Sequence, residues 1–204
     1  MQTTADTPTL PARQKILLAA HDLFYRDGVR ATGVDKVIAQ AHVTKVTFYR
    51  HFPSKNDLVL AFLEYRHQLW LSWFRAALRR HGGAPGGGLR PLLPALAEWF
   101  SQPEFRGCAF INIAAEISDE AEYMTLCRCH KQDMLAVIGE LPALTCPNRA
   151  AIAAAAGVAV DGSIVKTQID GDAHAALSAL ALILDGLDAL ASAGNRFSPS
   201  DQRL

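Results

Sequence analysis

The sequence has 204 residues with a formal net charge of zero, and half of its residues are hydrophobic. A chain of this length buries roughly two-thirds of its unfolded surface, which is enough for one or two domains with a proper core. No uninterrupted apolar run reaches the ~18–20 residues of a membrane span, and the first ten residues are polar rather than signal-like. We therefore expect a cytoplasmic protein whose four cysteines stay reduced.

Charge is distributed unevenly along the chain. Residues 1–80 contain 12 Lys and Arg against 6 Asp and Glu, a net charge of +6. Residues 81–204 contain the remaining 8 against 14, a net charge of −6. The zero total argues against a nucleic-acid-binding protein, but this distribution indicates that the first part of the chain alone contacts a polyanion.

Apolar residues recur with helical spacing along most of the sequence, and no β-alternation holds for more than a few residues. The expected fold is all-α with about nine helices. The expected helices cover residues 11–27, 34–41, 44–52, 54–80, 90–101, 108–117, 118–141, 148–167 and 173–193.

Several residues are expected to start or break these helices. Pro11 suits the first turn of the first helix. Ser54 and Asp57 have the spacing of a capping box at the start of the long fourth helix, and Ser118 is expected to cap the seventh. The stretch HGGAPGGG at residues 81–88 predicts a flexible break after the fourth helix.

Residues 34–52 predict two short helices joined by a tight corner. The first has apolar residues with the spacing of one buried face, at Val34, Val37, Ile38 and Ala41. His42 is expected in the left-handed conformation at the corner, and Thr44 is expected to cap the second helix. Phe48 and Phe52 lie four residues apart and are expected to point inward together with Val43.

The remaining side chains of this second helix are expected to face outward. They are Lys45, Val46, Thr47, Tyr49, Arg50 and His51. Two cations, a hydroxyl, a phenol and an imidazole are unusual for a merely solvated face, although a solvated helix hairpin is the plain alternative. The set fits a helix that lies in a DNA major groove.

The segment from Gly28 to Lys55 resembles the DNA-binding domain of the tetracycline-repressor (TetR) family of bacterial transcriptional regulators. The matching residues are Gly28, Thr32, Val34, Ile38, Ala39, Ala41, Val43, Thr44, Phe48, Tyr49, His51, Phe52, Ser54 and Lys55. The resemblance implies a helix-turn-helix DNA-binding domain at residues 11–57 and a helical effector-binding and dimerisation domain at residues 58–194. Residues 1–10 are expected to form a disordered arm and residues 195–204 a tail.

The sequence departs from the family pattern at three positions: Gly33 replaces a capping hydroxyl residue, and His42 and Val46 each stand where Gly is common. An exposed Val46 suits contact with a thymine methyl group. The resemblance implies that residues 45–47 approach base edges and that neighbouring residues hold phosphates, with Arg50 able to do either. The implied DNA-binding set is Arg30, Thr32, Thr44, Lys45, Val46, Thr47, Tyr49, Arg50, His51 and Lys55.

The last two predicted helices have more apolar surface than the polar residues of one chain can cover. In the TetR family the corresponding pair meets its two-fold mate as a four-helix bundle, so the resemblance implies a homodimer and a palindromic operator with half-sites about one helical turn apart. The alternative is that both are simply core helices. The expected interface residues are Ala153, Val160, Ile164, Leu177, Leu180, Leu184 and Leu187.

The middle of the chain is expected to hold a small-molecule effector of unknown identity, and no other cofactor. The long fourth helix has more aromatic residues than its length requires, and Asn112 and Glu116 share a helix face where a ligand would supply their polar contacts. Alternatively, the aromatic residues are plain core. The expected ligand-binding residues are Phe62, Arg66, Trp70, Trp99, Phe110, Asn112, Glu116 and Tyr123.

Metal-dependent and enzymatic functions find little support. Cys127, Cys129 and His130 form a C-x-C-H cluster, but only Cys127 and His130 share a helical face, which leaves too few ligands for a closed zinc site. No nucleophile–base spacing or phosphate loop is recognisable, so an enzyme is not expected. The sequence predicts a DNA-binding repressor released by a ligand, while a thiol or metal sensor and a helical scaffold without DNA binding remain alternatives.

Overall fold

The computed structural model describes residues 10–143 and 145–193. Within these residues it contains nine α-helices and no strand, which confirms the all-α prediction. The helices are α1 (Ala12–Asp27), α2 (Val34–Ala41), α3 (Lys45–His51), α4 (Lys55–Arg80), α5 (Leu92–Phe100), α6 (Ala109–Glu116), α7 (Ala121–Ile138), α8 (Arg149–Asp170) and α9 (His174–Ala193). The expected arm, except for Leu10, and the expected tail lie outside the described residues.

Every predicted helix limit agrees with the observed one to within three residues. The capping box at the start of α4 is confirmed: Ser54 Oγ accepts the N–H of Asp57 at 3.1 Å, and the Asp57 carboxylate accepts the N–H of Ser54 at 2.9 Å. The expected cap at Ser118 is wrong. Helix α7 begins three residues later, after Glu120, because residues 117–120 are needed to connect α6 to α7.

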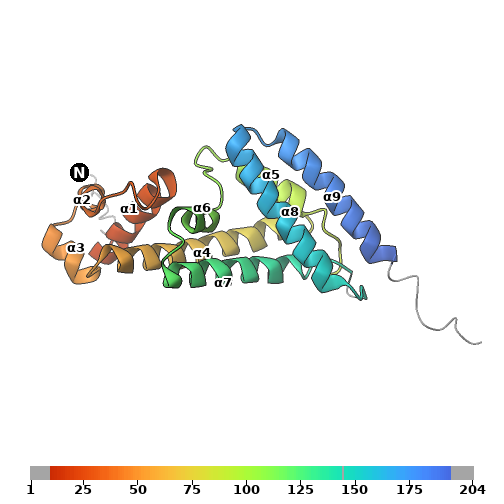
Figure 1. The fold of residues 1–204 in the computed structure, drawn as a ribbon, viewed down its shortest axis with the longest axis horizontal. Helices are drawn as coiled ribbons and strands as arrows, with labels where there is room; N and C mark the ends of the chain where they lie inside the picture. Colours follow the sequence, from red (N-terminus) through yellow and green to blue (C-terminus); the bar gives the residue numbers. More distant parts are fainter. Residues whose placement is uncertain (1–9, 144, 194–204) are drawn as a thin grey trace, which may run out of the picture.

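Figure 1 shows an elongated molecule in which α1, α2 and α3 gather at one end. Helix α4 starts at that end and runs along the molecule, with α7 packed beside it. Helices α8 and α9 lie side by side at the opposite end. A single 26-residue helix therefore connects the three-helix unit with the rest of the chain.

One apolar stripe of α1 holds the three-helix unit together. It consists of Ile16, Ala19, Ala20, Leu23 and Phe24, which recur every three or four residues and are buried against α2, α3 and α4. Phe48 and Phe52 are also buried and Val43 is half-buried against the same core, so the predicted inward face of the second short helix is confirmed.

Most of the residues expected at a dimer interface lie instead in the core of the single chain. Ala153, Val160 and Ile164 of α8 and Leu180 and Leu184 of α9 are buried, and Leu177 and Leu187 are half-buried against the same core. For the five buried residues the prediction is wrong, because α8 and α9 are apolar on more than one face, whereas an interface role for half-buried Leu177 and Leu187 stays a prediction. Sequence periodicity alone did not determine which face packs inward.

The outer faces of α8 and α9 nevertheless form an exposed apolar stripe. Its members recur every three or four residues: Ala151, Ala155, Val158, Gly162, Val165 and Ile169 on α8, and Ala175, Ala179, Leu182, Gly186 and Leu190 on α9. A Cβ atom added at Gly162 or Gly186 would point into open space. By length and composition both helices are also apolar enough to cross a bilayer, although Asp161 and Asp185 interrupt them.

Candidate nucleic-acid interface and ligand cleft

The corner between α2 and α3 has the predicted geometry. His42 adopts φ 52° and ψ 46°, the left-handed conformation, and is the single non-glycine residue with positive φ in the part of the chain that the structure describes. The Thr44 hydroxyl accepts the N–H of Thr47 at 3.1 Å and so caps α3, as predicted. Phe48 and Phe52, at most 2% exposed, anchor the inner side of α3.

The outer side of α3 is open to solvent. Val46 is 71% exposed, and the Lys45 side chain is 67% exposed with its ammonium 3.7 Å from the Asp35 carboxylate. Thr44, Tyr49 and Arg50 are exposed as well, whereas Thr47 and His51 are half-buried. No Asp or Glu occurs between Lys36 and Asn56. This face therefore presents cations and hydroxyl groups of the kind that hold phosphates and read base edges.

Two of the residues expected to bind DNA have partners inside the protein. Thr32 is fully buried, and its hydroxyl donates to the Gly28 carbonyl oxygen at 2.7 Å while its N–H bonds to Val29. A direct phosphate contact by Thr32 is therefore wrong. Lys55 is half-buried and donates from Nζ to the Val29 carbonyl oxygen at 2.6 Å, which leaves its other ammonium protons for a phosphate.

Lys36, which the sequence analysis did not select, lies on the exposed side of α2. Its Nζ is 2.6 Å from Asp27 Oδ2, and Arg26 contacts the same carboxylate. Hydrogen bonds from Arg26 and then Lys36 hold the pKa of Asp27 well below its usual range. Position 36 has a sequence signal, because it is a cation on the polar side of a helix whose apolar side is Val34, Val37 and Ala41.

The turn after α1 is held by two other helices. Glu116, at the end of α6, accepts the N–H groups of Val29 and Arg30, the first at 3.1 Å. Lys55, at the start of α4, bonds to the carbonyl oxygen of Val29. Gly28 has φ 87°, and a Cβ there would lie 3.3 Å from both Glu116 carboxylate oxygens, so only glycine fits this turn without strain.

Tyr25 makes a second junction between α1 and the rest of the chain. Its hydroxyl donates to the Gly107 carbonyl oxygen at 3.0 Å and accepts the N–H of Arg106 at 3.1 Å. Both hydrogen-bonding roles of the phenol are thereby used on the connection between α5 and α6. Together with Glu116, Tyr25 ties the three-helix unit to this connection and to α6.

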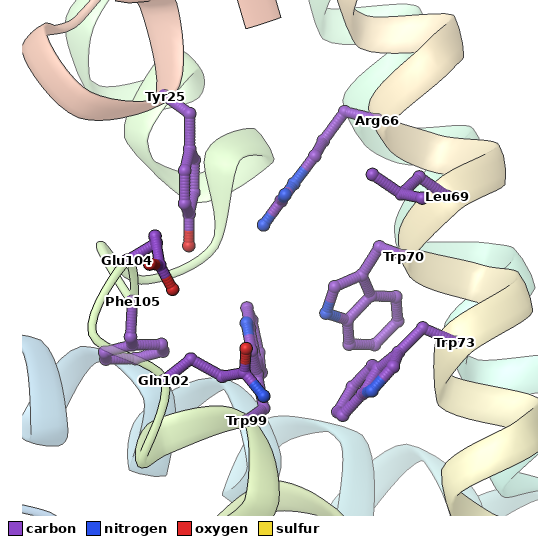
Figure 2. A pocket seen from close by; sticks show the side chains of 9 residues that line it. All are labelled: Tyr25, Arg66, Leu69, Trp70, Trp73, Trp99, Gln102, Glu104 and Phe105. Carbon is purple, nitrogen blue, oxygen red and sulfur yellow. The ribbon is translucent and has the colours of Figure 1, made fainter. Parts of the chain in front are cut away.

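A cleft of about 230 Å³ lies between α4, α5 and the connection that follows α5. Its lining residues are Tyr25, Arg66, Leu69, Trp70, Trp73, Trp99, Gln102, Glu104 and Phe105. Figure 2 shows the three tryptophans on one side of the space and the Arg66 guanidinium pointing into it. A second cleft of about 410 Å³ shares Tyr25, Arg66 and Glu104, so the two adjoin.

Three of the expected ligand-binding residues, Arg66, Trp70 and Trp99, line this cleft. Phe110 lies elsewhere, at a shallow groove between α6 and α7, with its ring stacked on His130 at 3.7 Å between centroids. Phe62 is buried between α1 and α4, where it meets Phe24 edge-on. Tyr123 is buried in the core, where desolvation raises the pKa of its phenol to about 12.

Asn112 and Glu116 already have polar partners inside the chain. Asn112 donates to the Arg106 carbonyl oxygen at 2.8 Å and accepts from Gln168 at 3.3 Å, and Glu116 binds the turn after α1. They do not depend on a ligand for their polar contacts, but both line a further cleft of about 230 Å³ together with Phe62, so their expected role in ligand binding stays a prediction. A sequence shows that a polar side chain needs a partner, but it does not show that the partner is a main-chain group of a distant turn.

The C-x-C-H cluster has the helical geometry expected of it. Cys127 and His130 are buried, whereas Cys129 is exposed. Cys127 Sγ lies 3.5 Å from the Phe110 carbonyl oxygen, and burial raises the pKa of its thiol to about 11. Within residues 10–143 and 145–193 no group of three or more His, Cys, Asp or Glu is arranged to hold a metal ion.

Comparison with known proteins gives the same assignment as the corner, the caps and the outward face of α3. The family model for bacterial regulatory proteins of the tetR family matches residues 16–62. The HTH-type transcriptional regulator TtgR of Pseudomonas putida is 30% identical over 155 residues, an alignment that covers 69% of this chain and 73% of that protein. This chain belongs to the TetR family.

Other relatives agree over shorter or more distant alignments. The HTH-type transcriptional activator FasR of Mycolicibacterium smegmatis is 39% identical, but over only 33% of this chain and 31% of that protein. The crystal structure of SCO4454, a TetR-family regulator from Streptomyces coelicolor, superposes with a TM-score of 0.72 at 26% identity and covers 90% of this chain and 96% of the other. The chain is thus a DNA-binding transcriptional regulator of the TetR family, and such regulators act in the cytoplasm.

Proposed function

We propose that this TetR-family chain is a homodimeric repressor that binds a palindromic operator through α3 and is released by a small molecule bound in the aromatic cleft. The observation that carries the proposal is the layout of α4. One end of this helix follows α3 directly in the chain and packs against α1, and its middle supplies Arg66, Trp70 and Trp73 to the cleft. A rigid helix of 26 residues connects the two sites.

The exposed stripe on α8 and α9 supports the dimer. Contiguous exposed apolar patches usually mark interaction sites, and Gly162 and Gly186 leave room for a second helix to approach closely. A two-fold copy that covers this stripe completes a four-helix bundle. The two α3 helices then meet half-sites about one helical turn apart. Lys45, Val46 and Thr47 lie at base edges, and the flanking cations lie at phosphates. The protein is associated with the nucleoid when it is bound to DNA.

Release requires that ligand binding be coupled to the position of α1. The cleft and its neighbour share Tyr25, whose hydroxyl bonds to the α5–α6 connection, and Glu116 holds the turn after α1. A ligand that shifts α4 or this connection therefore moves the three-helix unit through those two junctions. Coupling of ~1–3 kcal/mol is typical, and near-complete release needs more.

The test is DNA binding by the wild type and by Glu116→Gln, measured by fluorescence anisotropy on DNA flanking the protein's own gene, with and without a compound that occupies the cleft. The amide retains one acceptor but loses the charge that holds two N–H groups, so we expect the ligand-induced change in DNA affinity to fall at least about threefold. The control is Glu120→Gln, an exposed neighbour. Absence of salt-dependent wild-type binding, or full ligand response in Glu116→Gln, contradicts the proposal.

A further inference from the structure

The indole N–H of Trp70 has no hydrogen-bond partner among residues 10–143 and 145–193. Trp70 is 5% exposed, and its Nε1 atom is buried without a hydrogen bond. Figure 2 shows this nitrogen edge turned toward the space between Arg66 and Trp99. The neighbouring Trp73 differs, because its Nε1 donates to Glu98 at 3.4 Å. Buried donors are almost always paired, so the Trp70 N–H identifies a place for an acceptor inside the cleft.

Arg66 supplies a second set of open donors in the same cleft. Its guanidinium lies over the Tyr25 ring, 4.0 Å from the centroid, and one of its nitrogens is 3.4 Å from His21 Nε2. No carboxylate lies within 4.0 Å of it among the described residues. A guanidinium has five N–H donors in a planar fork that matches a carboxylate, so most of this fork is available to a ligand.

The walls of the cleft are flat and aromatic. The rings of Trp70 and Trp99 meet edge to face at 5.4 Å, and Phe105 meets Trp99 in the same way at 5.2 Å. A cavity of about 230 Å³ bounded by such rings suits a ligand of one or two fused rings rather than a long chain.

Arg66 is the charged residue that points into the cleft, whereas the other charged groups nearby lie at its rim or have partners. Glu104 is exposed at the rim, and Glu98 is held by Arg80 and His81. The adjoining cleft contains Arg26 and Arg106 together with Asp22. Arg26 and Arg106 balance Asp22 and Glu104, so Arg66 supplies the excess positive charge of the two clefts, which favours an anion over a cation despite the aromatic walls.

We propose that the cleft binds a planar aromatic carboxylate, with its ring against the tryptophans, its carboxylate on Arg66, and an oxygen that accepts the Trp70 N–H. This inference rests on the proposed function, because it names the chemical class of the effector. It also gives the ligand a route to the DNA-binding unit. A carboxylate on Arg66 draws the guanidinium from the ring of Tyr25, the residue that joins α1 to the α5–α6 connection.

Three naphthalene probes of similar size test the charge preference in calorimetric titrations of the full chain. They are naphthoate, the neutral naphthamide and the cationic naphthyltrimethylammonium. We expect naphthoate to bind at least about tenfold more tightly than naphthamide, and the cation to bind most weakly. All three tryptophans of the chain line this cleft, so quenching of tryptophan emission locates the bound probe there. Equal affinities, or tightest binding of the cation, overturn the proposal.

Paired variants separate a binding role from a structural one. Arg66→Gln is expected to abolish the preference for naphthoate over naphthamide, whereas Arg75→Gln on the same helix, which removes an arginine that faces Glu140, is expected to retain it. Trp70→Phe retains an aromatic side chain but removes the open N–H and part of the ring area, so both probes should bind about three- to tenfold more weakly. Trp73→Phe removes an N–H that already has a partner and should have a smaller effect. Retained selectivity in Arg66→Gln, confirmed as folded by circular dichroism, overturns the proposal.

The DNA-binding assay distinguishes failure of this inference from failure of the proposed function. If naphthoate binds in the cleft with the expected selectivity but leaves operator affinity unchanged, the ligand class stands and release through this cleft is refuted. If the neutral or cationic probe releases the operator and naphthoate does not, regulation through the cleft stands and the aromatic carboxylate is refuted.

Discussion

The outward face of α3 and the outer faces of α8 and α9 are both exposed, but they differ in chemistry and in how far the sequence determines them. Helix α3 is amphipathic, with buried Phe48 opposite exposed Val46. Helices α8 and α9 are apolar on both sides, so Leu184 is buried while Leu182, two residues earlier, is 77% exposed. When a helix has one apolar and one polar face, its sequence shows which face points outward. When both faces are apolar, the sequence does not show which one packs inside the chain and which one is left for a partner.

Leu182 and Leu184 look alike in the sequence, but the first faces outward and the second faces the core. We predict that Leu182→Asp breaks the dimer, because it places a charge in an apolar interface. Operator affinity should fall more than about 100-fold, since a monomer loses half of its DNA contacts. Light scattering after size-exclusion chromatography and operator anisotropy measure both effects. Gln132→Asp, exposed on α7, is the control and should remain dimeric. A dimeric Leu182→Asp protein would contradict the assignment of the stripe.

Leu184→Ala should do the opposite. Leu184 is fully buried between α8 and α9, so its truncation leaves a cavity and should lower the free energy of unfolding by about 2–5 kcal/mol. The mass measured by light scattering should remain that of the dimer, because the outer stripe is unchanged. Urea unfolding at fixed protein concentration measures the loss of stability. A dissociated but equally stable variant would mean that Leu184 faces the partner.

A smaller effect is expected from the buried histidine of α7. Desolvation lowers the pKa of His130 to about 2, with lesser contributions from Lys131, His67 and Arg66, while Asp133 lies 3.3 Å from His67. In the unfolded chain the His130 imidazole takes up a proton below a pH of about 6.5, but in the folded chain it does not. The contribution of His130 is therefore constant above about pH 6.5, and below it the free energy of unfolding falls by up to about 1.4 kcal/mol per pH unit.

His130→Phe should remove this part of the pH dependence and retain the stacking on Phe110. Urea unfolding between about pH 7.5 and pH 5 measures the slope for wild type and variant. His174→Gln, an exposed histidine at the start of α9, should leave the slope closer to that of the wild type. An unchanged slope in His130→Phe would show that this histidine is protonated in the folded state.

Features determined by neighbouring residues were predictable from the sequence, and features determined by distant ones were not. The corner at His42, the cap at Thr44 and the buried pair Phe48 and Phe52 each depend on a few consecutive residues, and all are confirmed. The inward hydroxyl of Thr32 depends on the shape of the turn that follows α1. The contact between Glu116 and Val29 joins residues 87 positions apart through a main-chain N–H, which no side-chain pattern encodes.

The central claim is that the outward face of α3 reads DNA, and its most direct test is operator binding by Lys45→Ala and Lys55→Ala across single-base operator variants and a salt series. The account predicts that Lys45→Ala reduces discrimination at one operator position, by about 1–3 kcal/mol. Lys55→Ala should weaken binding to all sequences about equally and reduce the slope of log affinity against log salt by about one. Undiminished discrimination between operator variants in Lys45→Ala would contradict the claim.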